Sequence, residues 1–181
     1  MEYRTSKRTK ALLSILGGVA AGSSLGALLG GVASLMTVSQ RAAVASAAAF
    51  GLVIAAILDN KPIQVRTETP RSLLDRGPVA WSLLNGALLG VGVASRLGFW
   101  LWYAIPLGVL VVGSATGGAV LWGLYGFSRM TMIAADASRM HDDTALDRAD
   151  SMLRRSTVMK WSTRLATFVF AGVVLGVVGL G

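Results

Sequence analysis

The residue with the clearest capacity for chemistry is an arginine inside an apolar stretch. Arg96 is the only charged side chain in the segment 85–103, which reads NGALLGVGVASRLGFWLWY. A guanidinium is permanently charged and presents a planar fork of donors, which suits carboxylate or phosphate groups. On one helix, Asn85, Arg96 and Tyr103 would share a face, with Ser95 beside it. Asn85, Ser95, Arg96 and Tyr103 are therefore candidate contacts for an anionic ligand or a partner.

Two other interpretations of Arg96 stay open. Arg96 lies sixteen residues beyond Ala80, which on a helix is about 24 Å into a hydrocarbon core about 30 Å thick. The side chain can therefore extend to lipid headgroups, beside an aromatic belt at residues 99–103. It can also form an ion pair with a partner subunit.

Other chemistries find little support in the residue types. The chain has no cysteine, and its one histidine lies in the polar run His141-Asp142-Asp143, which we expect to be solvated rather than metal-binding. The apolar segments contain no Asp, Glu or His, so their serines lack a base and a proton relay lacks a carrier. The Gly-rich run 17–31 lacks the lysine of a phosphate-binding loop. We expect no enzyme activity, no cofactor and no metal.

The composition indicates that a lipid bilayer surrounds the elements that position these residues. The chain has 181 residues, of which 54% are hydrophobic and 14% are charged, whereas soluble domains carry about 25% charged residues. Apolar segments of a length that spans a bilayer occur five times. They cover roughly 11–36, 42–58, 79–102, 104–128 and 162–180.

The charges predict an orientation for these five segments. Basic residues number four in 1–10, four in 59–79 and seven in 129–164, which are fifteen of the 17 in the chain. Five crossings place these three regions on the same side, and basic loops stay in the cytoplasm. The sequence therefore predicts an N-terminus inside and a C-terminus outside. The net charge of +8 is a topology signal, and we expect no nucleic-acid binding.

Glycines at four-residue spacing form stripes that predict close helix packing. Shifting the chain by 72 residues superposes the first stripe on the second, and also Phe50-Gly51-Leu52 on Trp122-Gly123-Leu124. This match favours two related helical hairpins, with chance matching in a Gly- and Ala-rich sequence as the alternative. The packing residues are Gly18, Gly22, Gly26, Gly30, Gly86, Gly90, Gly98, Gly172 and Gly176.

The polar region before the last span predicts an amphipathic helix on the inner surface. Asp143 or Thr144 can cap its start, and apolar residues then recur on one face. A solvated connector is the alternative. The basic residues that would contact anionic lipid or a cytosolic partner are Arg148, Arg154, Arg155 and Lys160.

Three short motifs carry a resemblance to a known family. They are Gly-Val-Gly-Val-Ala-Ser-Arg at 90–96, Phe-Trp-Leu-Trp-Tyr at 99–103 and Gly-Gly-Ala-Val-Leu-Trp-Gly-Leu-Tyr-Gly at 117–126. This pattern resembles small membrane proteins of the DsbD/CcdA and MauE type. The resemblance implies repeated helical hairpins and a role in moving reducing equivalents or maturing periplasmic enzymes. That family uses a pair of membrane cysteines, which this chain lacks, so no redox residue carries over.

Together these observations predict an all-α, polytopic membrane bundle of five transmembrane helices in a bacterial cytoplasmic membrane. Its expected parts are a basic cytoplasmic N-terminus (1–10), a first hairpin (11–58), a cytoplasmic loop (59–78), a second hairpin (79–128), a cytoplasmic amphipathic segment (129–161) and a fifth span (162–181). We expect a non-catalytic packing subunit that contacts anionic lipids and a membrane-protein partner or a second copy. The alternatives are a small carrier or channel for an anionic or neutral solute, and a thiol-less accessory of the DsbD/CcdA kind.

Overall fold

The computed structural model describes residues 6–58, 77–92, 100–139 and 145–179. Within these ranges the chain is helical apart from short links, and no strand occurs. Six α-helices and one short 3₁₀ helix make up the described fold. The prediction of an all-α protein is confirmed.

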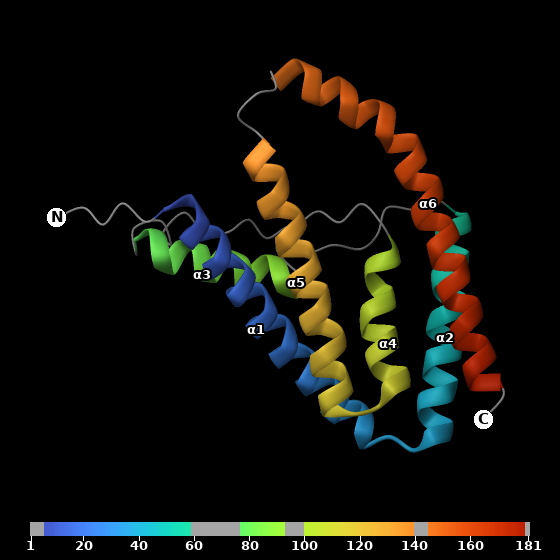
Figure 1. Ribbon diagram of the computed structural model, residues 1–181. Coiled ribbons are helices and arrows are strands. Elements are labelled where there is room, and N and C mark those ends of the chain that lie inside the picture. Colours follow the sequence, from blue (N-terminus) through green and yellow to red (C-terminus); the bar gives the residue numbers. More distant parts are fainter. Residues whose placement is uncertain (1–5, 59–76, 93–99, 140–144, 180–181) are drawn as a thin grey trace.

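The first two helices begin with side-chain caps. In α1 (Lys7–Ser34) the Ser6 hydroxyl accepts the Thr9 backbone N–H at 3.2 Å. In α2 (Val38–Ile57) Thr37 and Gln40 form a reciprocal capping box. Such caps satisfy backbone donors that have no partner inside the helix. The two helices meet at residues 35–37 and then diverge (Figure 1).

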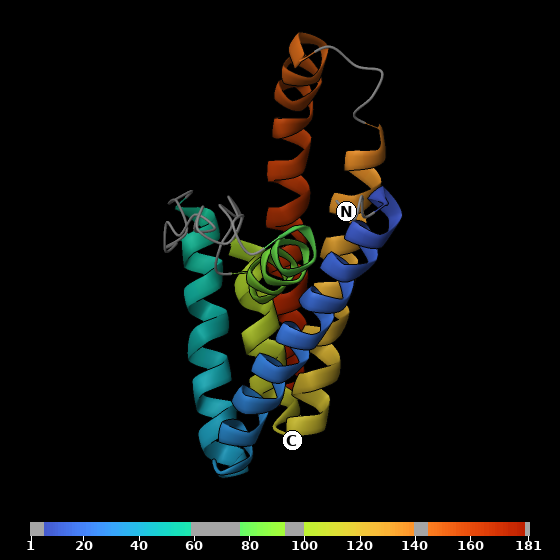
Figure 2. The same cartoon turned by 90° about the vertical axis from the view of Figure 1, so that its left-hand side faces the viewer.

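The third apolar segment is interrupted. We expected one helix over 79–102, but α3 (Pro78–Val91) ends at Gly92, whose φ of +84° is left-handed and cannot continue a right-handed helix. The chain is next described in a 3₁₀ turn, η2 (Trp100–Tyr103), that leads directly into α4 (Ala104–Val112). Helix α3 lies across the direction of α2 and α4, as the two perpendicular views show (Figures 1 and 2).

The fourth apolar segment is divided as well. We expected one helix over 104–128, but α4 ends at Gly113, which has a φ of +60°. Helix α5 (Ala115–Arg139) then returns along α4, with the Ser114 hydroxyl accepting the Gly117 N–H at 3.1 Å. The Arg41 guanidinium of α2 lies directly against Gly113. A positive charge there complements the carbonyl end of α4.

The last helix is longer than one crossing requires. Helix α6 (Ala145–Gly179) has 35 residues, or about 52 Å at 1.5 Å per residue. Residues 145–161 of the expected amphipathic segment and 162–179 of the expected fifth span therefore form one continuous helix, whereas residues 129–139 belong to α5. In Figure 1 the N-terminal part of α6 extends beyond the ends of α2 and α4.

The helices pack in two groups that are not the two predicted hairpins. Helix α1 packs along α5 and α3, whereas α2 packs along α6, and α4 and η2 lie between the groups. A small core joins the second group: Ala45, Ala49 and Leu52 of α2 meet Leu107 of α4 and, from α6, Ala171 and Val174. Helices α1 and α2 are thus adjacent in sequence but packed in different groups, because α1 takes its main partner from the second half of the chain.

Within the described ranges, three helices are long and apolar enough to cross a membrane: Arg8–Ser34, Val38–Ile57 and Trp161–Gly179. Many of their large apolar side chains point outward. Leu28, Val38 and Leu165 are 69%, 71% and 65% exposed. Soluble monomers rarely expose an apolar surface this extensive, whereas contact with lipid or with membrane partners would cover it. The prediction of a helical membrane protein is confirmed at this level.

Candidate functional site: the interrupted third segment

The glycine stripe of α1 is filled by the backbone of α5. A Cβ placed on Gly22 would lie 2.7 Å from the carbonyl oxygen of Trp122, and one on Gly18 would lie 2.6 Å from Met130. Gly26 and Gly30 approach the backbone of Gly118 and Ser114 even more closely. The two helices therefore run antiparallel with their backbones in contact, which only residues without a side chain allow.

The second stripe meets the first in a specific register. Gly90 lies against the backbone of Gly18, and Gly86 lies against the backbone of Ser14. The Ser14 hydroxyl also donates to the Ser82 carbonyl at 3.0 Å. In both glycine contacts the residue numbers differ by 72, which is the offset of the sequence repeat. Helices α1 and α3 therefore run in the same direction where they touch, and they meet at equivalent positions of the two proposed repeats.

The third pair of glycines behaves differently. A Cβ on Gly172 or Gly176 of α6 would have no described atom within 4 Å. Both residues lie on the exposed side of α6, together with Leu165, Val169 and Val173. Within the described residues this stripe therefore packs against no other helix.

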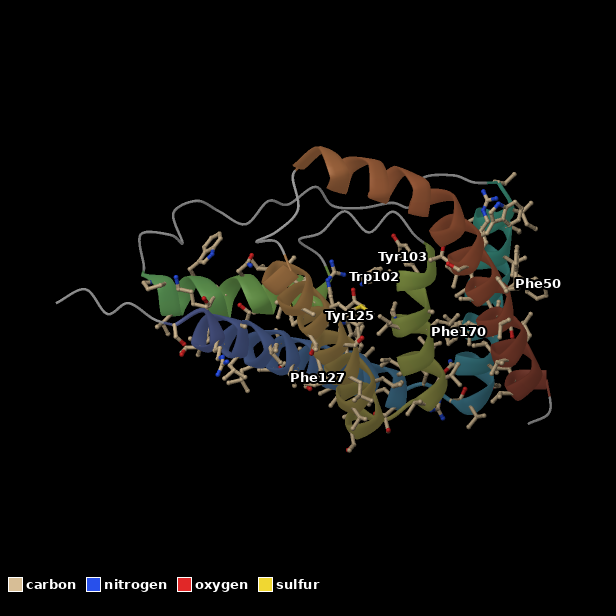
Figure 3. The ribbon with its side chains drawn as sticks, turned by 45° about the horizontal axis from the view of Figure 1, so that its top comes forward. Phe50, Trp102, Tyr103, Tyr125, Phe127 and Phe170 are labelled. Carbon is tan, nitrogen blue, oxygen red and sulfur yellow. The ribbon has the colours of Figure 1, made fainter. Side chains whose placement is uncertain are left out.

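An aromatic cluster lies where α3 ends and α4 begins. The Trp102 indole covers Gly92, at the end of α3. The Trp102 ring meets Tyr103 at 5.0 Å and Trp122 at 6.3 Å between centroids, both edge to face. Figure 3 shows Trp102 and Tyr103 at the upper end of α4, with Tyr125 on the neighbouring α5. The absence of a side chain at Gly92 makes room for the indole, because a Cβ there would collide with the ring.

A charged side chain completes this cluster. The Arg129 guanidinium donates to the Tyr125 hydroxyl, and its Cζ lies 5.7 Å from the centre of the Tyr125 ring. Trp122, Tyr125 and Arg129 are spaced three and four residues apart on α5, so they share one face. The charge pattern alone places Arg129 among the basic residues of the predicted cytoplasmic region 129–164. Its spacing of four residues from Tyr125 is the sequence signal that links it to the aromatic residues.

The predicted contact residues do not form one stripe. Asn85 lies on α3, which packs on α1 and α5, whereas Tyr103 lies in η2, which packs on α6, α4 and α2. The predicted shared face required one helix over 79–102, and that helix does not exist. Ser95, Arg96 and Gly98 lie outside the described residues. The backbone at Arg148, Arg154, Arg155 and Lys160 belongs to α6, but their side chains lie outside the description.

Hydrogen-bond donors dominate the cluster. An indole and a guanidinium donate only, whereas a phenol both donates and accepts. Among the described residues no group of three or more His, Cys, Asp or Glu side chains gathers to hold a metal ion. The cluster can therefore bind a chemical group that accepts hydrogen bonds.

Comparison with known proteins found no matching family, no matching curated protein and no matching solved structure. Function therefore has to be inferred from the residues and contacts of this chain.

Proposed function

We propose that the protein is a non-catalytic, multi-pass subunit that packs within a larger complex of a bacterial cytoplasmic membrane. The chain would cross five times, through α1, α2, the η2–α4 segment, α5 and α6. The interruption of the third apolar segment would not add a crossing, because α3 lies across the bundle while α4 runs along it (Figure 2). The distribution of basic residues then supports an N-terminus inside and a C-terminus outside.

The observation that supports the packing role is the open stripe on α6. The small-residue stripes of α1 and α3 are filled inside the chain, and each filled glycine touches the backbone of another helix. Gly172 and Gly176 have the same four-residue spacing and remain open. Small residues on a lipid-facing helix let a second backbone approach closely. The proposed occupant is a transmembrane helix of another subunit.

The inner surface would add a second contact. The positively charged residues Arg148, Arg154, Arg155 and Lys160 belong to the N-terminal half of α6. Figure 1 shows the N-terminal part of this helix extending beyond α2 and α4. Each such side chain near an anionic leaflet contributes about 1 kcal/mol of attraction. We propose that this part of α6 lies close to anionic headgroups or to the cytosolic side of the partner.

Purification from the native membrane tests the packing role. The tagged full-length chain is extracted in mild detergent, and the accompanying proteins are quantified by mass spectrometry. We expect a stoichiometric partner, which the double substitution Gly172→Ile and Gly176→Ile releases by about tenfold, the equivalent of ~1.4 kcal/mol. Gly31→Ile is the matched control, because Gly31 also has no atom within 4 Å of a Cβ position. A chain that purifies alone, or a partner that survives the double substitution, would contradict the proposal.

A second candidate is a small carrier or channel, and the interruptions favour it. Gly92 and Gly113 end helices inside apolar segments and so release backbone groups from helical hydrogen bonds. Such breaks within a membrane are tolerated where they are buried in protein or line a path, and transporters place their sites there. Recovery of a lone monomer or homo-oligomer in the purification would favour this candidate, with Arg96 as the first residue to substitute.

A further inference from the structure

We propose that Trp102, Trp122, Tyr125 and Arg129 form a binding site for an oxyanion, a phosphate or carboxylate group. This inference goes beyond the packing role and does not depend on it. Trp102 comes from η2, covers Gly92 at the end of α3 and meets the Trp122 ring. Tyr125 and Arg129 lie on the same face of α5 as Trp122.

Two buried donors in this cluster have no acceptor. The indole Nε1 atoms of Trp102 and Trp122 are both buried, and neither makes a hydrogen bond of good geometry. Trp122 is only 2% exposed, so solvent cannot satisfy its N–H from outside. A buried donor without a partner costs about 1–3 kcal/mol. Two of them side by side are unusual unless an acceptor is bound there.

The one acceptor that these four side chains contain is already in use. The Tyr125 hydroxyl oxygen accepts from Arg129, whereas the Trp102 N–H makes no hydrogen bond of good geometry. A phenol that accepts a hydrogen bond keeps its own O–H proton, so the Tyr125 hydroxyl can also donate. The cluster thus presents indole and phenol donors beside a guanidinium, and none of the four side chains supplies an acceptor to the two indole N–H groups.

The chemistry of the donors defines the ligand class. Indole N–H, phenol O–H and guanidinium groups complement oxygen atoms that carry negative charge, and charge-assisted hydrogen bonds are about twice as strong as neutral ones. The proposed oxyanion is either the phosphate of a lipid headgroup or a free anion. An ordered water is the alternative acceptor, and it would leave the site indifferent to oxyanions.

Indole N–H resonances can detect this ligand directly. The full-length chain is labelled with ¹⁵N-tryptophan and placed in phosphatidylcholine nanodiscs, and the signals of Trp102 and Trp122 are assigned from the Trp102→Phe and Trp122→Phe variants. One arm adds inorganic phosphate or acetate, and the other replaces part of the lipid with phosphatidylglycerol. We expect both indole signals to move to lower field in one arm, because hydrogen bonding deshields the proton. Movement in the first arm identifies a free anion, and movement only in the second identifies a lipid phosphate.

Substitution of the arginine supplies the control. Arg129→Gln should weaken the response about tenfold or more, since a hydrogen bond to a charged group contributes about 1.5–3 kcal/mol. Arg164→Gln is the matched control, because Arg164 also lies over a tryptophan, with its Cζ 5.4 Å from the Trp161 ring centre. Arg129→Lys retains the charge and should retain part of the response if Arg129→Gln fails to fold. Indole signals that stay fixed in both arms, or that move equally in the Arg129→Gln variant, would overturn the proposal.

Discussion

At the scale of single residues, one residue type has three different roles in this chain. Gly26 lies where two backbones touch, whereas Gly31, five residues further on, has no described atom within 4 Å of its Cβ position. Gly113 takes a left-handed conformation with the Arg41 guanidinium packed against it. Composition and spacing do not separate these roles, because each depends on what a neighbouring helix places beside the glycine.

The difference between Gly26 and Gly31 leads to a prediction about stability. An alanine at either position gains about 1 kcal/mol of helix propensity. At Gly26, however, the new Cβ would collide with the backbone of Gly118 and come within 2.8 Å of Trp122, and overpacking of this kind costs about 1–3 kcal/mol. We expect Gly26→Ala to lower the free energy of unfolding in detergent and Gly31→Ala to leave it unchanged or raise it. Equal effects of the two substitutions would show that α1 and α5 are not in contact at Gly26.

At the scale of elements, the decisive feature is where helices end. The apolar segments 79–102 and 104–128 are long enough for single spans, yet left-handed glycines end α3 at Gly92 and α4 at Gly113. The sequence does not mark these two glycines, since glycine is also frequent inside the continuous helices α1 and α5. Apolar content predicted which segments are helical, and tertiary contacts such as Trp102 on Gly92 determined where two of them stop.

A single substitution distinguishes the interrupted segment from the continuous helix that we expected. In a continuous helix, Gly92→Ala would raise stability by about 1 kcal/mol. In the structure Gly92 has a φ of +84° and lies under the Trp102 indole, so an alanine suffers about 1–2 kcal/mol of backbone strain and displaces the ring. We expect the thermal midpoint of Gly92→Ala to fall. A higher midpoint would contradict the interruption.

At the scale of the whole molecule, the helices are arranged differently from the two hairpins that the repeat implied. The offset of 72 residues does connect touching positions, because Gly18 meets Gly90 and Ser14 meets Gly86. The partners of these helices are not equivalent, since α5 packs on α1 whereas α2 packs on α6. Pairing of helices distant in sequence depends on tertiary packing, which a repeat in one chain does not specify.

The candidate site was predictable only in part, for the same reason. The sequence predicts Asn85 and Tyr103 on one helical face, but the end of α3 separates them onto α3 and η2, which pack against different helices. Trp122, Tyr125 and Arg129 share a face of α5 at a spacing that is visible in the sequence. Their meeting with Trp102 depends on the turn at Gly92, and no periodicity predicts that contact.

Both proposals presuppose that the chain crosses the membrane five times, and the side on which each turn lies is the most direct test. The chain has no cysteine, so each introduced cysteine is the only thiol. Met36→Cys lies between α1 and α2 and Ser114→Cys between α4 and α5, whereas Ser6→Cys and Ala145→Cys lie at the starts of α1 and α6. An impermeant maleimide applied to intact cells should label the first pair, and the second pair only after permeabilisation. Labelling of Met36→Cys and Ser114→Cys from opposite sides would contradict the five crossings.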